Sequence, residues 1–316
     1  NLYAVGNESY GYMSGGRWTS DPSGTYRQSR TERIDYANDN VAAATKGSLS
    51  SRSEEGGATG NANYGYFGGG YIYPAPNPAS SKVDRLDYAN DTTTATPKGS
   101  LSVGRFFVSA TGNVNYGWFG GGYDQFPQPS NVSSIIDRID YANDTAVASV
   151  RGSLNYDRAR AGATGSANYG YWAGGNDGST SYTNIERVDY ANDTGTASIR
   201  SNLPYTPGPA YGKQSNSGAA SGQANGIRSE TAIYTPRVRF IDGIEVGKGG
   251  TPGPQAGPSN GYVMGGYPAG CAVDRIDFAN DTNTAVTKGD LCFPSYRGGG
   301  NGNMSFGYTF GGNSSS

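Results

Sequence analysis

Arginine and aspartate recur at one fixed spacing, and these are the side chains with which this sequence could do chemistry. In the segment 84–88 they are Arg85 and Asp87, and the same pair returns in four other copies. The set is Arg33 and Asp35, Arg85 and Asp87, Arg138 and Asp140, Arg187 and Asp189, and Arg275 and Asp277. Carboxylates can act as acids or bases, but beside guanidinium groups they form charge-assisted hydrogen bonds. Five near-identical copies fit equivalent joints better than active sites, so we predict ion pairs that join one repeat unit to the next.

Composition argues against most catalytic chemistry. The 316 residues contain no histidine, which removes the usual general base, the commonest metal ligand and the centre of a Ser-His-Asp triad. The glycine clusters lack the Lys-Ser/Thr of a phosphate loop, and no calcium-loop pattern occurs. A carboxylate pair suited to glycoside hydrolysis stays open, although every strand acid belongs to the repeat. We predict no catalytic residue, no cofactor and no metal site.

Two cysteines, Cys271 and Cys292, flank the third and fourth strands expected in the last complete repeat. Pairing Phe278 with Asn283 across the intervening turn would set the cysteines nearly opposite each other. Their Cα atoms would then suit the separation of about 4.4 to 6.8 Å that a disulfide requires. Two alternatives stay open: a disulfide, which would favour an oxidising extracellular setting, and two buried free thiols.

An Asn-Asp-Thr sequence follows the arginine phrase in four copies. It makes Asn90, Asn143, Asn192 and Asn280 candidate glycosylation sites. Asn and Asp are also favoured in β-turns, and the first copy, at 38–40, keeps Asn-Asp but loses the sequon. Turn formation is therefore the better explanation, and glycosylation is the alternative.

These residues recur because the chain repeats a unit of about fifty residues. The tyrosine of the phrase stands at 36, 88, 141 and 190, and the gap from there to Phe278 is long enough to contain a degenerate copy, for which the segment 238–242 is the candidate. Each unit predicts four strands: one ending in Ala-Thr-Gly-Asn, an aromatic strand ending in Gly-Gly, the Arg-Ile-Asp-Tyr strand, and a Thr-rich strand followed by Lys or Arg and Gly.

A four-stranded antiparallel unit cannot bury both faces alone, so the units must stack, and the radial solution is a β-propeller. We predict an all-β propeller of six four-stranded antiparallel blades, or seven if a Gly-Gly strand near Gly218 is counted, as one domain over residues 1–316. The expected blades are 1–49, 50–101, 102–154, 155–203, 204–248 (the degenerate copy) and 249–291. Residues 292–316 are expected to close the ring, in preference to starting a blade that another segment completes.

The wording of the repeat resembles two known groups. Gly-Gly after an aromatic strand, Asp-Tyr in the next strand and a later Arg resemble the kelch motif, which implies a propeller. Asp-Arg-Ile-Asp-Tyr-Ala-Asn-Asp-Thr, with Tyr-Gly-Tyr-Phe-Gly-Gly-Gly, resembles tandem repeats in tail-fibre and other virion proteins of aquatic bacteriophages, over nearly the whole chain except about residues 205–260. This resemblance implies a virion or extracellular location and partners that are copies of itself or other fibre subunits.

The loops between the Gly-Gly strand and the third strand vary in sequence. Their candidate ligand residues are Tyr71, Tyr73, Tyr123, Phe126, Asp177 and Tyr182. Aromatic and amide side chains on a rigid scaffold can bind saccharides or proteins. The alternative is that these loops are merely tolerant connections.

Net charge and hydropathy limit the partners. The net charge of −2, from 24 basic and 26 acidic residues, provides no basic face for nucleic acid. No run approaches the roughly eighteen apolar residues of a membrane span, so no membrane insertion is expected. We therefore expect a non-enzymatic structural and binding protein of a virion tail, fibre or other extracellular appendage, which contacts host-surface glycans. The alternatives are a secreted carbohydrate-active enzyme or lectin, and an intracellular kelch-type adaptor.

Overall fold

Five four-stranded antiparallel sheets make up the body of the protein in a computed structural model. The structure describes residues 2–16, 27–72, 79–124, 131–204, 218–220, 239–241, 244–246, 260–264, 270–295, 299–302 and 307–310. No helix within these residues is long and apolar enough to cross a membrane.

Each of the first four sheets uses one copy of the repeat, in the predicted strand order. Blade I contains β1 (Tyr3–Gly6), β2 (Tyr10–Ser14), β3 (Thr31–Asp35) and β4 (Ala44–Lys46). Blade II contains β6 (Gly57–Gly60), β7 (Tyr64–Gly68), β9 (Val83–Asp87) and β10 (Thr96–Pro97), and β5 (Ser53–Glu54) pairs with β8 (Tyr71–Ile72). Blade III contains β11 (Ser109–Gly112), β12 (Tyr116–Gly120), β13 (Ile135–Asp140) and β14 (Ser149–Ser153). Blade IV contains β15 (Gly162–Gly165), β16 (Tyr169–Ala173), β17 (Asn184–Asp189) and β18 (Ser198–Asn202).

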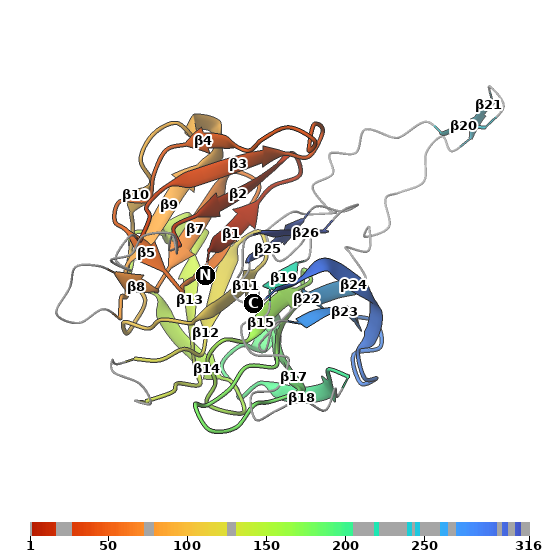
Figure 1. The fold of residues 1–316 in the computed structure, drawn as a ribbon. Coiled ribbons are helices and arrows are strands. Elements are labelled where there is room, and N and C mark those ends of the chain that lie inside the picture. The colour runs from red at the N-terminus through yellow and green to blue at the C-terminus, as the bar shows by residue number, and fades with distance from the viewer. Residues whose placement is uncertain are drawn as a thin grey trace.

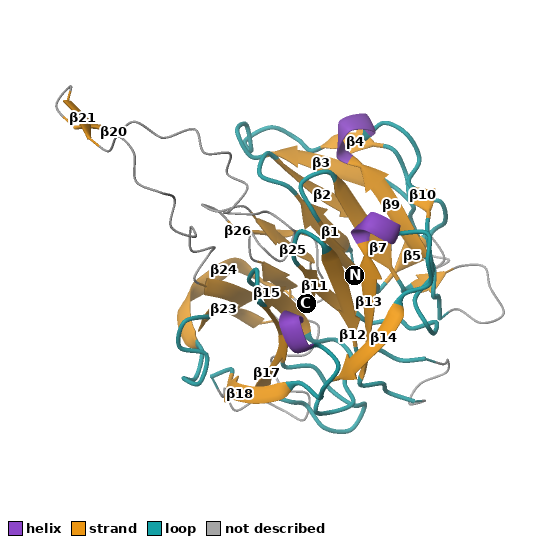
Figure 2. Ribbon diagram, turned by 180° about the vertical axis from the view of Figure 1, so that it is seen from behind, coloured by secondary structure: helices purple, strands orange, loops and turns teal. Residues whose placement is uncertain are grey.

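The fifth sheet is assembled from segments more distant in sequence. Blade V contains β19 (Gly218–Ala220), β22 (Asn260–Met264), β23 (Gly270–Asp277) and β24 (Val286–Ser295). Two further hairpins are β20 (Arg239–Ile241) with β21 (Ile244–Val246), and β25 (Gly299–Gly302) with β26 (Gly307–Phe310). The turns η1 (Tyr88–Asn90), η2 (Tyr141–Asn143) and η3 (Tyr190–Asn192) follow the third strands of blades II to IV (purple in Figure 2).

The first strands of the sheets form a ring around a common centre (Figure 1). Strands β1, β6, β11, β15 and β19 contact one another in that order, and β25 contacts both β19 and β1. The two-stranded β25–β26 sheet therefore lies between blades V and I. This arrangement confirms the all-β propeller with four-stranded antiparallel blades.

The predicted count of six or seven blades is wrong, because the described residues form five four-stranded blades. In the segment expected to be a degenerate blade, β20 pairs with β21 and not with an aromatic Gly-Gly strand. The strand at Gly218 pairs with β22 and is thus the first strand of blade V, so it does not begin a seventh blade.

Aromatic stacking between blades forms much of the core, which explains how a chain poor in aliphatic residues can fold. In blades I to IV, an aromatic residue of the second strand lies over the phrase tyrosine, or its phenylalanine replacement, in the next blade. The ring centroids are 4.8 Å apart for Tyr12 and Tyr88, 4.7 Å for Tyr66 and Tyr141, 3.8 Å for Trp118 and Tyr190, and 4.9 Å for Tyr171 and Phe278. Such pairs add about 0.5 to 1.5 kcal/mol each beyond the burial of their surface.

Glycine after the fourth strand lets neighbouring blades approach closely. The amide of Gly99 donates to the Asp144 carbonyl in the next blade at 2.8 Å. A methyl group on Gly99 would overlap the carbonyl oxygen of Ala146, and the same holds for Gly47 and Thr93. Since these obstacles are backbone atoms, a side chain at either glycine requires the two blades to separate.

We predict that Gly99→Ala destabilises the protein by about 1 to 3 kcal/mol, because the added methyl group overpacks a seam between two blades. The matched control is Gly195→Ala, where nothing lies within 4 Å of the added methyl group. Thermal unfolding followed by circular dichroism checks both variants. Equal melting temperatures for the two would contradict the close approach at Gly99.

Candidate functional site

The most extensive polar site is a joint between neighbouring blades, centred on the aspartate of the Asn-Asp turn. Asp144 of blade III accepts hydrogen bonds from three strands of blade II. The Tyr66 hydroxyl, on the second strand, donates to Asp144 at 2.9 Å, and Arg85 Nη1, on the third strand, donates at 2.6 Å. Lys98 Nζ, from the residue directly after the fourth strand, lies 3.1 Å from the same carboxylate. One carboxylate thus connects the outer three strand positions of one blade to the turn of the next.

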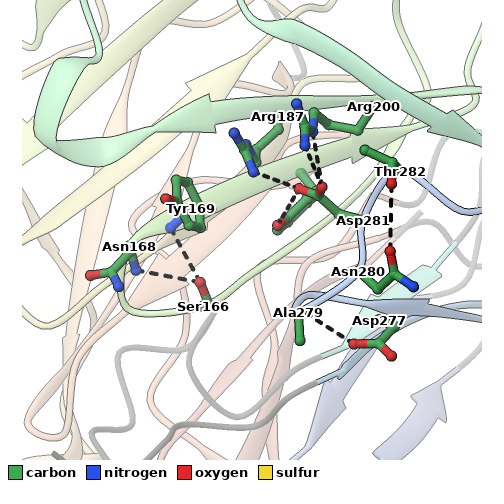
Figure 3. A network of polar contacts seen from close by, with 11 residues as sticks. Ser166, Asn168, Tyr169, Arg187, Arg200, Asp277, Ala279, Asn280, Asp281 and Thr282 are labelled. Atoms are coloured by element: carbon green, nitrogen blue, oxygen red, sulfur yellow. Dashed lines mark hydrogen bonds and ion pairs between the residues drawn. The ribbon is translucent and has the colours of Figure 1, made fainter.

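The same joint occurs at three other seams. Asp91 is bound by Tyr12, Arg33 and Lys46, Asp193 by Trp118, Arg138 and Arg151, and Asp281 by Tyr171, Arg187 and Arg200. Figure 3 shows Arg187 and Arg200 converging on Asp281. Where Trp118 replaces the tyrosine, its indole N–H donates to Asp193 at 2.8 Å, so the geometry of the joint survives the change of donor.

The joint keeps its aspartate ionised although the side chain is buried. Asp144 is 7% exposed. Burial alone would raise its pKa, but hydrogen bonds from Lys98 and Tyr66 and the charge of Arg85 outweigh burial and lower the pKa of Asp144. The pKa values of Asp91 and Asp281 are lowered in the same way. Burial and the adjacent Asp144 raise the pKa of Tyr66, which therefore stays a neutral donor.

In the structure, the predicted arginines and aspartates bind different partners and do not pair with each other. Arg33, Arg85, Arg138 and Arg187 reach the turn aspartate of the following blade. The aspartates two positions on accept from the backbone N–H of the alanine in their own turn, at 2.9 to 3.0 Å. Those residues are Asp35, Asp87, Asp140, Asp189 and Asp277, and they cap the turns that hold the joint aspartates.

Sequence reasoning missed half of each joint. It treated the second residue of Asn-Asp only as a turn former, and it gave no role to the basic residue of the fourth strand. Both recur at constant spacing in the repeat, which is the signal that could have identified Asp91, Asp144, Asp193 and Asp281 with Lys46, Lys98, Arg151 and Arg200.

A second buried ion pair lies within a blade and was also missed. Arg105 is fully buried and donates to Asp137 at 2.7 Å and to the carbonyl of Gly121 at 2.6 Å. Arg158 pairs likewise with Glu186 and with the Gly174 carbonyl. Burial lowers the pKa of Arg105, and the charge of Asp137 opposes this.

Blade II lacks this arginine, and a tyrosine of blade I takes its place. Ser53 occupies the position equivalent to Arg105. The Tyr3 hydroxyl hydrogen-bonds to Ser53 and donates to the Gly69 carbonyl at 3.0 Å. The carbonyl of the first of the paired glycines thus receives a side-chain donor in blades II, III and IV.

The described residues of the predicted ligand loops make contacts within the protein, and one of them, Tyr123, is buried. Tyr123 is buried, and its hydroxyl donates to Asn176 at 3.1 Å, while Tyr71 is half-buried and packs edge-on against Phe106. Tyr182 donates to Asp177 at 2.8 Å. Tyr73 and Phe126 lie outside the described residues.

Asp177 and Tyr182 meet beside an exposed aromatic ring. Tyr156, 40% exposed, stacks on Tyr182 with centroids 5.1 Å apart. Burial and the hydrogen bond to Asp177 raise the pKa of Tyr182 to about 12. Burial would raise the pKa of Asp177, but hydrogen bonds from Thr180, Ser179 and Tyr182 lower it.

The remaining candidates concern covalent modification. The side chains of Cys271 and Cys292 lie outside the described residues, so the disulfide stays a prediction. Asn90, Asn143, Asn192 and Asn280 are exposed, and each directly precedes a buried joint aspartate. Glycosylation at these turns also stays a prediction.

No protein-family model matches the chain, and no curated protein matches its sequence.

We predict that Asp144→Asn costs about 2 to 3 kcal/mol of stability, because it leaves the Arg85 and Lys98 charges at a seam without their anion. Asp39→Asn is the matched control, since Asp39 holds the same turn position in blade I but is exposed and, among the described residues, accepts a hydrogen bond from Tyr308 alone. Chemical denaturation of both variants measures the difference. A loss at Asp39 as large as at Asp144 would contradict the role of the complete joint.

Acid should weaken the joints. The folded-state pKa values of Asp91, Asp144 and Asp281 are lowered, so their stabilisation is fully present above the unfolded-state value of about 3.9. It is lost as the pH falls through the lower folded-state values. We expect a constant melting temperature from pH 7 to pH 5 and a steep fall below about pH 4. Asp144→Asn should show a shallower fall than the unmodified protein, and parallel curves would contradict the assignment.

Proposed function

We propose that this chain is a non-enzymatic structural protein with a binding surface, a rigid propeller that builds a virion tail, a fibre or another extracellular appendage. The observation that carries the proposal is the joint that recurs at four seams, in which one buried aspartate gathers three donors. Repeated charged joints of this kind favour a stiff scaffold. The resemblance of the repeat to kelch and phage tail-fibre sequences supports the same role.

The use of the repeated acids favours this structural role over an enzyme. Asp137 and Glu186 are each held by a fully buried arginine, Asp87 and its equivalents cap turns, and Asp144 and its equivalents bind two cations. A glycoside hydrolase needs one carboxyl group that can give up a proton and one that can attack or activate water. The turn-capping and joint aspartates of the repeat are instead engaged in equivalent contacts from blade to blade.

Contact with host-surface glycans is the binding role that we propose for the face bearing the Gly-Gly loops. The stacked rings of Tyr156 and Tyr182 lie there beside the ionised Asp177, and exposed aromatic rings next to hydrogen-bonding groups suit saccharides. The same chemistry would serve a lectin, so the structural role and glycan contact are compatible.

Electron microscopy of the native particle or fibre tests the structural role. We expect this chain as a regularly repeated density of propeller shape, in contact with neighbouring subunits. A purified chain that stays monomeric and is found in no ordered assembly would overturn the proposal.

Glycan-array binding tests the surface role. We expect Tyr156→Ala to reduce binding by about tenfold, since it removes the exposed ring of the stacked pair. Val150→Ala is the control, because Val150 is also exposed, at 55%, but lies in β14. Equal binding by the two variants would remove Tyr156 from the binding surface.

A further inference from the structure

The β25–β26 sheet has the contacts of the inner half of a blade. Tyr308 of β26 stacks on Tyr36 of blade I, with centroids 5.0 Å apart, and its hydroxyl donates to Asp39 at 2.9 Å. Tyr66 makes the same two contacts with Tyr141 and Asp144. β25 and β26 thus stand where the first and second strands of a blade would stand.

Asp39, the turn aspartate next to this half blade, lacks among the described residues the two basic partners that its equivalents have. Its equivalents Asp91, Asp144, Asp193 and Asp281 are 3 to 7% exposed and each binds two basic side chains. Asp39 is exposed, and no basic side chain of the described residues pairs with it. At the complete joints, the two cations come from the third and fourth strands of the preceding blade. In the part of the chain that the structure describes, no strand pairs with the second edge of β26.

Blade V carries the donor residues of a joint without, among the described residues, the turn aspartate that such donors bind at the other seams. Tyr262, Arg275 and Val286 lie side by side across β22, β23 and β24, in the register of Tyr66, Arg85 and Thr96 in blade II. Lys288 follows Val286 as Lys98 follows Thr96, but Lys288 is exposed. Arg275 Nε is buried and has no hydrogen-bond partner among the described residues.

A glycine supports the same reading of this edge. Gly47, Gly99 and Gly152 each meet the backbone of the turn in the following blade. Gly289 holds the equivalent position in blade V, and no atom of the described residues lies within 4 Å of a methyl group placed there. Among the described residues, no turn occupies the space beside blade V that a turn occupies at the other seams.

The residues on both sides of the β25–β26 sheet, in blade I and in blade V, indicate which groups a partner must provide. Asp39 needs an arginine and a second cation from adjacent strands. Arg275 and Lys288 need a turn aspartate, and Tyr262 needs an aromatic ring to stack on. One sequence provides all of these at the correct spacing: the third strand, Ala-Asn-Asp turn and fourth strand of this repeat. The five copies in the chain are already paired within their own blades, in β3, β9, β13, β17 and β23.

We propose that a neighbouring subunit completes this half blade with a strand pair that carries a further copy of the repeat phrase. The neighbouring subunit as donor rests on the structural role proposed above. The third strand of the added repeat copy pairs with the edge of β26 that faces away from β25. The basic residues of the added strand pair bind Asp39, and the aspartate of its turn binds Arg275 and Lys288. Two joints are completed by one hairpin, a form of strand addition at an open sheet edge.

A peptide of this chain is the direct probe. Residues 134–153 contain the complete third strand, turn and fourth strand of blade III. We expect this peptide to bind the whole protein at one site, measured by calorimetry, with an affinity that falls as salt rises. A peptide with Arg138→Gln, Asp144→Asn and Arg151→Gln should bind at least tenfold more weakly.

Protein variants locate the site. Asp39→Asn and Lys288→Gln should each weaken peptide binding by about tenfold. Gly289→Ala should abolish binding while leaving the melting temperature unchanged, because its methyl group has room until the hairpin arrives. Asp157→Asn, which removes an exposed charge between blades III and IV, should have no effect. Failure of the peptide to bind, or equal effects of Asp39→Asn and Asp157→Asn, would overturn the proposal.

The source of the strand pair is decided separately. Excess peptide should disperse the native assembly, since it occupies the edge that the neighbouring subunit uses. An assembly that persists with the peptide bound would exclude the neighbouring subunit as donor and leave the structural role intact. A peptide that binds a chain found in no assembly would overturn the structural role and, with it, the neighbouring subunit as donor of the strand pair.

Discussion

The carboxylate of the turn aspartate is the group on which the rest of the structure depends. A four-stranded sheet does not fix its own angle to the next sheet, and apolar seams tolerate sliding. Asp144 removes this freedom, because donors from the second, third and fourth strands of blade II must all reach one pair of oxygen atoms. Charge-assisted hydrogen bonds depend on direction as well as distance. Equal joints therefore produce equal angles, and a repeating sequence becomes a ring.

Burial of the aspartate and the number of its donors change together. A buried carboxylate without cations would be strongly destabilising, whereas one with two cations and a hydroxyl can stay ionised. Asp144, with three donors, is 7% exposed. Asp39, with one, remains in solvent. The donors come from strands that fold as one sheet, so a complete blade is what makes burial of the next aspartate favourable.

Sequence patterns predicted the architecture better than the pairings within it. The alternation of apolar and polar residues and the fifty-residue repeat were sufficient to predict the strand order and the propeller. Both features of the fold follow from periodicity that can be read along the sequence. The blade count failed where a local resemblance at 239–241 was taken for a third strand, and where the pairing of β19 with β22 spans about forty residues without any repeat wording. Long-range pairing of that kind leaves no periodic signal.

The chemistry of the joint was half predictable for a similar reason. Arg85 and Asp87 lie two positions apart on one strand, so proximity in sequence suggested that they share a role. The arginine instead finds its anion in the next blade, fifty-nine positions away, and Asp87 caps its own turn. The spacing of Asp144 from Lys98 and Arg85 is as regular as that of the phrase itself. Only a three-dimensional arrangement shows that these regularities belong to one joint.

Each joint involves only two neighbouring blades, and this determines what the edge of β26 that is unpaired in the described part of the chain could bind. In a stacked repeat each unit contacts only its neighbours, so the four complete joints do not depend on what lies beyond them. The same kinds of donor and acceptor that hold blades together inside the chain lack a charged partner among the described residues at Asp39 and Lys288. A strand pair added there would make two more joints of the kind already present and would leave the others unchanged. A chain whose blades are held together by such joints has the side chains to bind another polypeptide that carries the same repeat sequence.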